Sequence, residues 1–190
     1  MAAIERSDLE RVAELVHKRN KIDQKIHSIV RRAVVHGHLG EYIAGGVFDL
    51  AINDNASTPG GDGVFLSGEL AGATVNVKWY GRREGILDLT TANRPQYYLV
   101  MTGPTGVGAR GGLRPLVIDA VYLFNASRLF EQQQSRGVKI GVASSVPKGL
   151  WEAAQVYPVN RTGLDVLPAD GERLLRLFAS PEADGSTQGG

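Results

Sequence analysis

The pattern of apolar and polar residues predicts two helices in the first 50 residues. Apolar residues recur at three- and four-residue spacings from residue 7 to about residue 35, and Ser7 with Glu10 forms a predicted capping box at the start. We expect the sequence His36-Gly37-His38 to interrupt this helix and a second helix to begin near Leu39. The apolar stripe of the second helix consists of Leu39, Ile43, Val47 and Leu50.

A different pattern, alternation of apolar and polar residues, predicts a β-hairpin between residues 60 and 81. Its second strand carries Asn76 and Lys78 on one face, because successive side chains of a strand point to opposite faces. The other face of this strand carries Val75, Val77 and Trp79. Asp62 precedes the first strand in a loop of turn-forming residues, and its glycine neighbours are expected to leave room for a substrate.

Shorter patterns over the rest of the chain complete an α/β domain with a mixed central sheet flanked by helices. The run at 96–101 is apolar along nearly its whole length, which is typical of a buried central strand. The other expected elements are strands at 86–89, 116–124 and 138–146, a helix at 126–135 that Gly137 ends, and a helix at 147–157 that begins at Pro147.

The length of 190 residues suits one domain with additions at both ends. We expect an N-terminal helical arm at 1–35, the α/β domain at 36–179, and a disordered tail at 180–190 that is rich in glycine, serine and acidic residues. The arm has two interpretations. It packs its apolar stripe within the chain while its charges are solvated, or it contacts a phosphate backbone or a second copy of the chain.

Composition narrows the function classes. The absence of cysteine excludes disulfides, thiolate metal sites and cysteine nucleophiles. The net charge of +1 gives no general affinity for nucleic acid, so a basic surface has to come from local clusters. The sequence lacks a signal peptide pattern and any apolar run of about 20 residues, so we expect a soluble cytoplasmic protein without a membrane partner.

Two sequence features resemble known sites but lack essential residues. The glycine-rich run at 103–110 nearly matches a phosphate-binding loop, yet Ala109 and Arg110 stand where lysine and a hydroxyl residue are required. His36 and His38 are spaced for a metal but have no third ligand nearby. Neither nucleotide hydrolysis nor a histidine metal site is therefore favoured.

A stronger set of residues is Glu41, Asp62, Asn76 and Lys78. Metal-dependent hydrolysis of a phosphodiester needs oxygen ligands for Mg²⁺ or Mn²⁺, an attacking water and a cation beside the phosphate. The carboxylates of Asp62 and Glu41 are the candidate metal ligands, Asn76 offers an amide oxygen, and Lys78 offers the cation.

These residues resemble the PD-(D/E)xK, or restriction-endonuclease-like, nuclease superfamily. Its pattern is a helix with a glutamate, then an aspartate near a hairpin strand, then a strand with [E/Q]-x-K, and here Glu41, Asp62 and Asn76-Val77-Lys78 fill those places. The likeness covers about residues 36–146. It implies an αβββαβ core, Mg²⁺ or Mn²⁺, DNA as substrate, and a bacterial endonuclease of restriction or defence type. The matching arginine rim, which would hold phosphates, is Arg82, Arg83, Arg94, Arg110 and Arg114.

Two departures from that pattern keep other functions open. Gly61 stands where proline is common, which is minor, but Asn76 replaces a glutamate or glutamine and binds Mg²⁺ less well than a carboxylate would. One alternative is a non-catalytic nuclease-like scaffold that binds DNA or a protein. Another is a purely structural dimer, in which Asp62 caps a turn and the stem of Lys78 packs on Tyr80.

Overall fold

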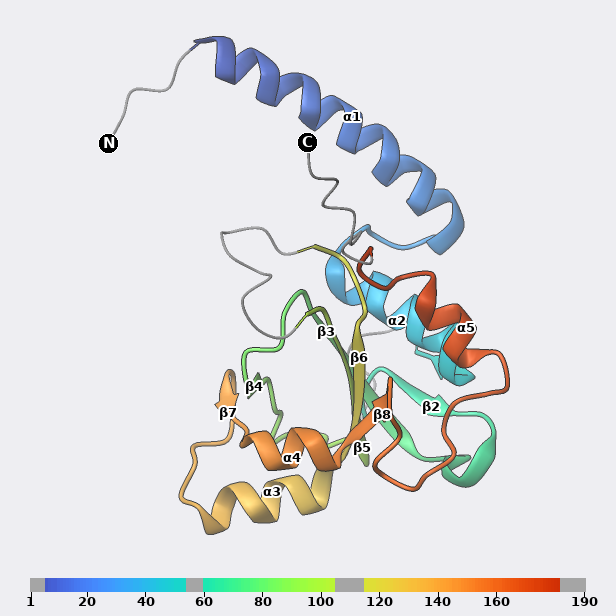
Figure 1. The fold of residues 1–190 in the computed structure, drawn as a ribbon, viewed down its shortest axis with the longest axis vertical. Helices are drawn as coiled ribbons and strands as arrows, with labels where there is room; N and C mark the ends of the chain where they lie inside the picture. Colours follow the sequence, from blue (N-terminus) through green and yellow to red (C-terminus); the bar gives the residue numbers. More distant parts are fainter. Residues whose placement is uncertain (1–5, 54–59, 105–114, 182–190) are drawn as a thin grey trace, which may run out of the picture. The chain divides into compact units, whose positions relative to one another are not determined.

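The computed structural model describes residues 6–53, 60–104 and 115–181. Contacts along the chain divide it into two compact units, Met1–Leu39 and Gly40–Gly190, which we describe separately. Figure 1 shows the ribbon of the chain with its helices and strands labelled.

The first unit is dominated by one long helix, α1 (Arg6–Val30). The predicted extension to residue 35 and the predicted break at His36-Gly37-His38 were both wrong, because α1 ends five residues earlier and His36 begins α2 (His36–Phe48). The helix ends where Arg31 adopts a left-handed conformation with φ of 56°. The Nδ1 atom of His27 then lies 2.9 Å from the carbonyl oxygen of Arg32, and this contact supports the turn.

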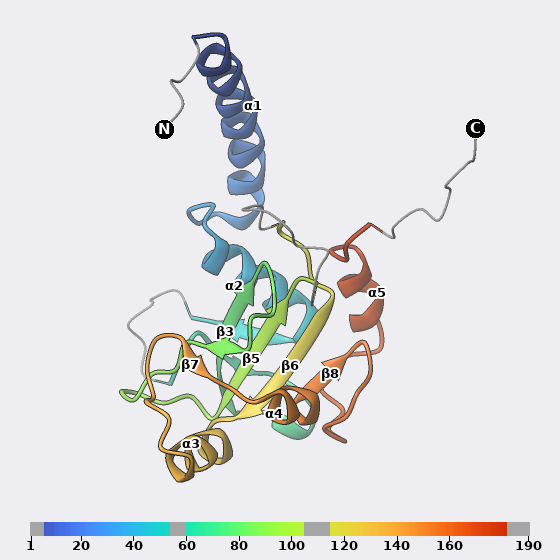
Figure 2. The same cartoon turned by 60° about the vertical axis from the view of Figure 1, so that its left-hand side comes forward.

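The second unit is built on a six-stranded sheet with strand order β1-β2-β3-β5-β6-β8. Strands β1, β2 and β3 form an antiparallel meander, β3 and β5 are parallel, and β5, β6 and β8 are antiparallel. Figure 2 shows β3, β5 and β6 side by side at the centre of this sheet. The strands are β1 (Leu50–Ile52), β2 (Gly63–Phe65), β3 (Thr74–Tyr80), β5 (Tyr97–Thr102), β6 (Ala120–Asn125) and β8 (Gln155–Tyr157).

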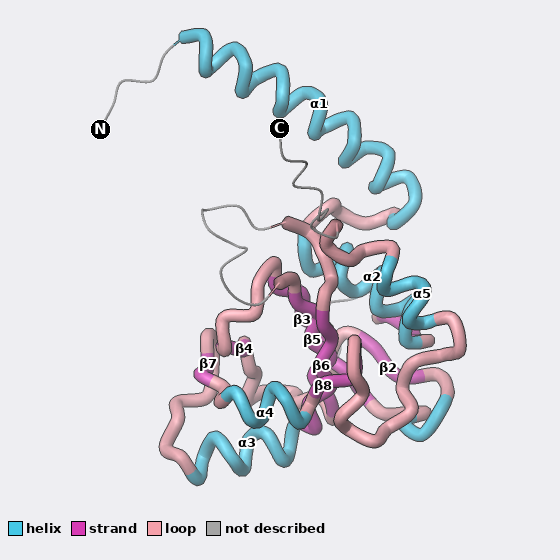
Figure 3. The backbone as a smooth tube through the Cα atoms, viewed as in Figure 1, coloured by secondary structure: helices cyan, strands magenta, loops and turns pink. Residues whose placement is uncertain are grey.

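Helices cover both faces of the sheet, as Figure 3 shows with the strands seen edge-on. One face carries the part of α2 that starts at Gly40, where a Cβ atom would lie 3.1 Å from the Cβ of Trp79. Helix α5 (Gly171–Arg176) packs on α2 at the same face. The other face carries α3 (Ala126–Ser135), α4 (Lys148–Ala153) and the small sheet of β4 (Ile86–Leu87) and β7 (Ser144–Ser145), together with a cluster of buried core residues.

Several predicted elements are confirmed. The fold is mixed α/β with a mixed central sheet and a long N-terminal helix, and α3 occupies the predicted range of 126–135. The alternation of β3 is also confirmed, because Val75, Val77 and Trp79 are buried while the residues between them are half-buried. A short 3₁₀ helix, η1 (Gly68–Leu70), fills the turn between β2 and β3. No described helix is long and apolar enough to cross a membrane.

Other predicted elements have different bounds. The strand expected at 138–146 is reduced to β7, which pairs with β4 outside the main sheet. The reason is a local turn in which Ala143 adopts a φ of 55° and its N–H donates to the Asp88 carboxylate at 2.7 Å. The strand expected from residue 116 begins at Ala120, and the helix expected to reach 157 ends at Ala153 before β8.

Candidate functional site

Asp62 lies directly before β2, and its backbone is hydrogen-bonded to β3 on one side and to the residue after β1 on the other. Its N–H donates to the carbonyl of Val75 at 2.8 Å, and its own carbonyl accepts from the N–H of Asn53 at 2.8 Å. The side chain reaches past the end of β2, where Oδ2 accepts from the N–H of Val77 at 2.7 Å. The carboxylate therefore lies against the backbone of β3, at the peptide that joins Asn76 to Val77.

Gly61 and Gly63 allow this close approach. Gly61 has a φ of 109°, and a Cβ atom on it would lie 2.6 Å from the carbonyl oxygen of Val75. A Cβ atom on Gly63 would lie 2.6 Å from the carbonyl oxygen of Ala51. The expectation that these glycines leave room for a substrate was wrong, because neighbouring backbone fills the space beside each of them.

Asn76 is the second polar residue at this point. Its Cα is separated from the N atom of Val77 by two covalent bonds, so it lies within about 5 Å of the Asp62 carboxylate. Its side-chain oxygen Oδ1 is buried and has no hydrogen-bond partner among the described residues. A buried amide oxygen without a partner is costly, and a bound cation or a donor on a ligand would relieve that cost.

Lys78 follows Asn76 by two residues and projects from the same face of β3, beside its parallel partner Val100. The side chain is half-buried, and within the described ranges its ammonium makes no hydrogen bond or ion pair. The next residue on that face, Tyr80, accepts a hydrogen bond from the N–H of Asp88 at 3.1 Å. Lys78 is thus a cation on the face that also carries Asn76.

Glu41 comes from a helix on the opposite face of the sheet. It follows Gly40, which packs on Trp79, and it shares a side of α2 with Gly45, where a Cβ atom would lie 3.1 Å from a side-chain carbon of Ile52. This side of α2 faces the end of the meander that contains Asp62, because Asn53, the residue after Ile52, bonds to Asp62. The structure therefore brings Asp62 to Asn76 and places Glu41 and Lys78 on opposite faces of β3.

The donor set for a metal is correspondingly small. No group of three or more histidine, aspartate or glutamate side chains in the described ranges is arranged to hold a metal ion. A cation at this point would be held by an Asp62 carboxylate oxygen, the Asn76 amide oxygen and water. Such a donor set fits Mg²⁺ or Mn²⁺, which accept oxygen ligands and keep several waters.

The predicted arginine rim is only partly described, because Arg110 and Arg114 lie outside the described residues. Arg82 is paired with Glu84 at 2.8 Å, which neutralises much of its charge. Arg83 donates to the Tyr122 hydroxyl at 3.3 Å and lies 5.8 Å from the centre of that ring. Tyr122 and Lys78 both neighbour Val100, on the same face, so Arg83 adds a second cation to the face of Lys78.

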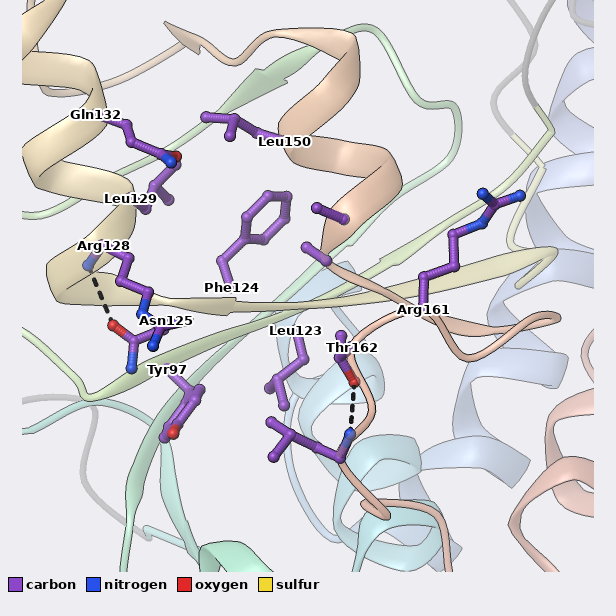
Figure 4. A pocket seen from close by; sticks show the side chains of 13 residues that line it. Tyr97, Leu123, Phe124, Asn125, Arg128, Leu129, Gln132, Leu150, Arg161 and Thr162 are labelled. Carbon is purple, nitrogen blue, oxygen red and sulfur yellow. Dashed lines mark hydrogen bonds between the residues drawn. The ribbon is translucent and has the colours of Figure 1, made fainter.

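A cavity that the sequence did not indicate lies between α3, α4 and the loop after β8 (Figure 4). Its volume is about 390 Å³, and none of the predicted site residues lines it. Two of its polar side chains serve local structure: Asn125 accepts from the N–H of Arg128 as an N-cap, and Thr162 accepts from the N–H of Leu164. Residues from four separate segments form this cavity, so no single sequence motif marks it.

Comparison with protein-family models gives no match to this chain, and comparison with curated protein sequences gives none either.

Proposed function

We propose that the chain is a metal-dependent endonuclease that hydrolyses phosphodiester bonds of DNA, of the restriction-endonuclease-like class and acting in the cytoplasm. The observation that carries the proposal is that the amide oxygen of Asn76 is buried without a partner among the described residues, while the next residue, Val77, donates its N–H to the Asp62 carboxylate. Two oxygen donors from adjacent strands, with a lysine on the same face as one of them, provide the groups that phosphodiester hydrolysis needs.

Each residue has a distinct role in this proposal. Asp62 and Asn76 hold the cation, and Glu41 supplies a second carboxylate from α2. A bound Mg²⁺ or Mn²⁺ would activate water and offset charge on the phosphate. Lys78 orients the attacking water or contacts the phosphate, and Arg83 holds a neighbouring phosphate of the backbone.

A second candidate function is a nuclease-like scaffold that binds DNA without cleaving it. Two observations favour it: Oδ2 of Asp62 is already used by the N–H of Val77, and Asn76 is neutral. One carboxylate oxygen and one amide bind Mg²⁺ more weakly than two carboxylates. This candidate predicts salt-sensitive DNA binding through Lys78 and Arg83 with no cleavage in any metal.

Nicking of supercoiled plasmid tests the proposal. We expect nicking in Mg²⁺ or Mn²⁺, and a loss of about 100-fold or more in Asp62→Asn. Asparagine keeps an oxygen that accepts from the N–H of Val77, so this variant removes the negative charge while preserving the local backbone contact. Asn76→Glu should raise activity, or lower the metal concentration needed, because it restores a carboxylate.

A substitution at an exposed lysine is the matched control for Lys78. Lys78→Ala should abolish nicking, whereas Lys148→Ala should not, because Lys148 is exposed and pairs with Glu152 on α4. Equal nicking by the wild type, Asp62→Asn and Lys78→Ala would assign any cleavage to another site. Salt-sensitive binding without nicking in either metal would establish the scaffold in place of the nuclease.

A further inference from the structure

Helix α1 carries a long apolar stripe that the chain leaves exposed. Six large apolar side chains along it are between 47% and 64% exposed, whereas Ile26 near its end is half-buried and Val30 is buried. The six are Leu9, Val12, Leu15, Val16, Ile22 and Ile29. A helix in water normally covers such a stripe, because exposed apolar surface costs free energy in proportion to its area.

The spacing of this stripe is that of a heptad repeat. Six residues follow one another at alternating spacings of three and four, which places them at positions a and d over nearly three heptads. They are Val12, Leu15, Arg19, Ile22, Ile26 and Ile29. The opposite positions b, c and f are polar in this register except for Ala13. Position a holds the branched Val12 and Ile26 with Arg19 between them, and position d holds Leu15, Ile22 and Ile29.

We propose that α1 pairs with α1 of a second copy as a parallel, in-register, two-stranded coiled coil. The flanking charges favour this orientation. Positions g are all basic, namely Arg11, Lys18 and Lys25. In a parallel pair Lys18 faces Asp23 of the second copy, and the stem of Arg11 covers the exposed Val16. An antiparallel pair would instead place the three basic residues against the same three in the partner, which is repulsive.

Arg19 gives the register. It occupies position a in the middle of the stripe, and its Nε lies 3.5 Å from Oδ2 of Asp23 on the same helix. A single polar residue at position a lowers the affinity of a coiled coil but specifies how the two strands align. In the in-register pair each Arg19 keeps its own Asp23, so two opposed guanidinium groups are accompanied by two carboxylates.

The test is the mass of the full chain in solution across a range of concentrations, by sedimentation equilibrium. We expect a reversible dimer whose dissociation constant rises about 100-fold or more in Ile22→Glu, which puts a charge at a buried d position. Gln24→Glu is the matched control, because it adds the same charge at position f and should change the constant less than about twofold. A monomer at every concentration, or a dimer unaffected by Ile22→Glu, would overturn the proposal.

Because the chain has no cysteine, engineered disulfides report the orientation. A parallel pair brings position 8 of both helices together, so Asp8→Cys should cross-link to itself on mild oxidation. Mixing Asp8→Cys with Ile29→Cys should give no cross-link between the two variants. Cross-linking of position 8 to position 29 would show an antiparallel pair and overturn the proposed orientation.

Discussion

Strand β3 and helix α1 carry equally regular apolar patterns, but their apolar side chains differ in exposure. Val77, on the apolar face of β3, is 6% exposed, whereas Ile22, on the apolar stripe of α1, is 57% exposed. Helix α2 covers the apolar face of β3, whereas most of the large apolar side chains of α1 are exposed. A periodic pattern thus identifies which face is apolar and leaves open what covers it.

The difference also separates two kinds of evidence for function. The chemistry of the polar face of β3 depends on its tertiary setting: the Asp62 carboxylate accepts from the Val77 N–H of the same strand, and the Asn76 side-chain oxygen is buried without a partner among the described residues. The apolar stripe of α1 points to self-association because most of its side chains are exposed. We therefore propose chemistry for the sheet and self-association for the helix.

The largest expected effect comes from placing the same charge in both regions. Val77→Glu buries an unpaired carboxylate under α2 and should lower the free energy of unfolding by about 3–5 kcal/mol. Ile22→Glu should leave the unfolding of the sheet unchanged and reduce self-association only. Chemical denaturation followed by tryptophan fluorescence measures the first effect. Equal destabilisation by both variants would contradict the comparison.

A smaller effect is expected where backbone packs on β3. Gly61→Ala places a methyl group 2.6 Å from the Val75 carbonyl at a φ of 109°, which should cost about 2–3 kcal/mol of stability. Gly46→Ala is the control, because no atom lies within 4 Å of the added Cβ on α2. That variant should stabilise by about 0.5–1 kcal/mol, since alanine favours a helix over glycine. Thermal unfolding of both variants tests the pair, and a neutral Gly61→Ala would show that the close contact is easily relieved.

The smallest expected effect is a dependence on alkaline pH at the end of β3. Burial raises the pKa of the Tyr80 phenol above its usual value of 10, and burial also raises the pKa of Tyr98. Both phenols favour the neutral form in the folded state, so their contribution to the free energy of unfolding is complete below pH 10. This contribution is lost as the pH rises from 10 toward the pKa of each phenol in the folded state, by at most about 1.4 kcal/mol per pH unit for each phenol.

Denaturation at pH 9, 10 and 11 measures this slope. Tyr80→Phe should flatten it, and the remainder should belong to Tyr98. Helix α1 contains no tyrosine, so absorbance at the phenolate band reports only on the second unit, in which Tyr42 of α2 also contributes. An unchanged slope in Tyr80→Phe would show that Tyr80 ionises normally.

The sequence by itself determined those elements whose pattern is local. The alternation of 74–80 defined both faces of β3, and the range 126–135 defined α3, because period and capping depend only on neighbours in the chain. Glu41, Asp62, Asn76 and Lys78 were found the same way, as residue types at a spacing. The pattern also defined the heptad stripe of α1.

Only the tertiary structure decided how these parts meet. The strand expected at 138–146 became a two-residue β7 because Asp88, 55 residues before Ala143, captures that residue's N–H. Asp62 bonds across 15 residues to Val77, and the backbone of Val75 and Ala51 fills the space that its glycine neighbours were expected to leave open. Glu41 and Lys78 lie on opposite faces of β3 because α2 packs on Trp79. Such long-range contacts depend on the packing of elements distant in the chain, and no periodicity within one segment encodes them.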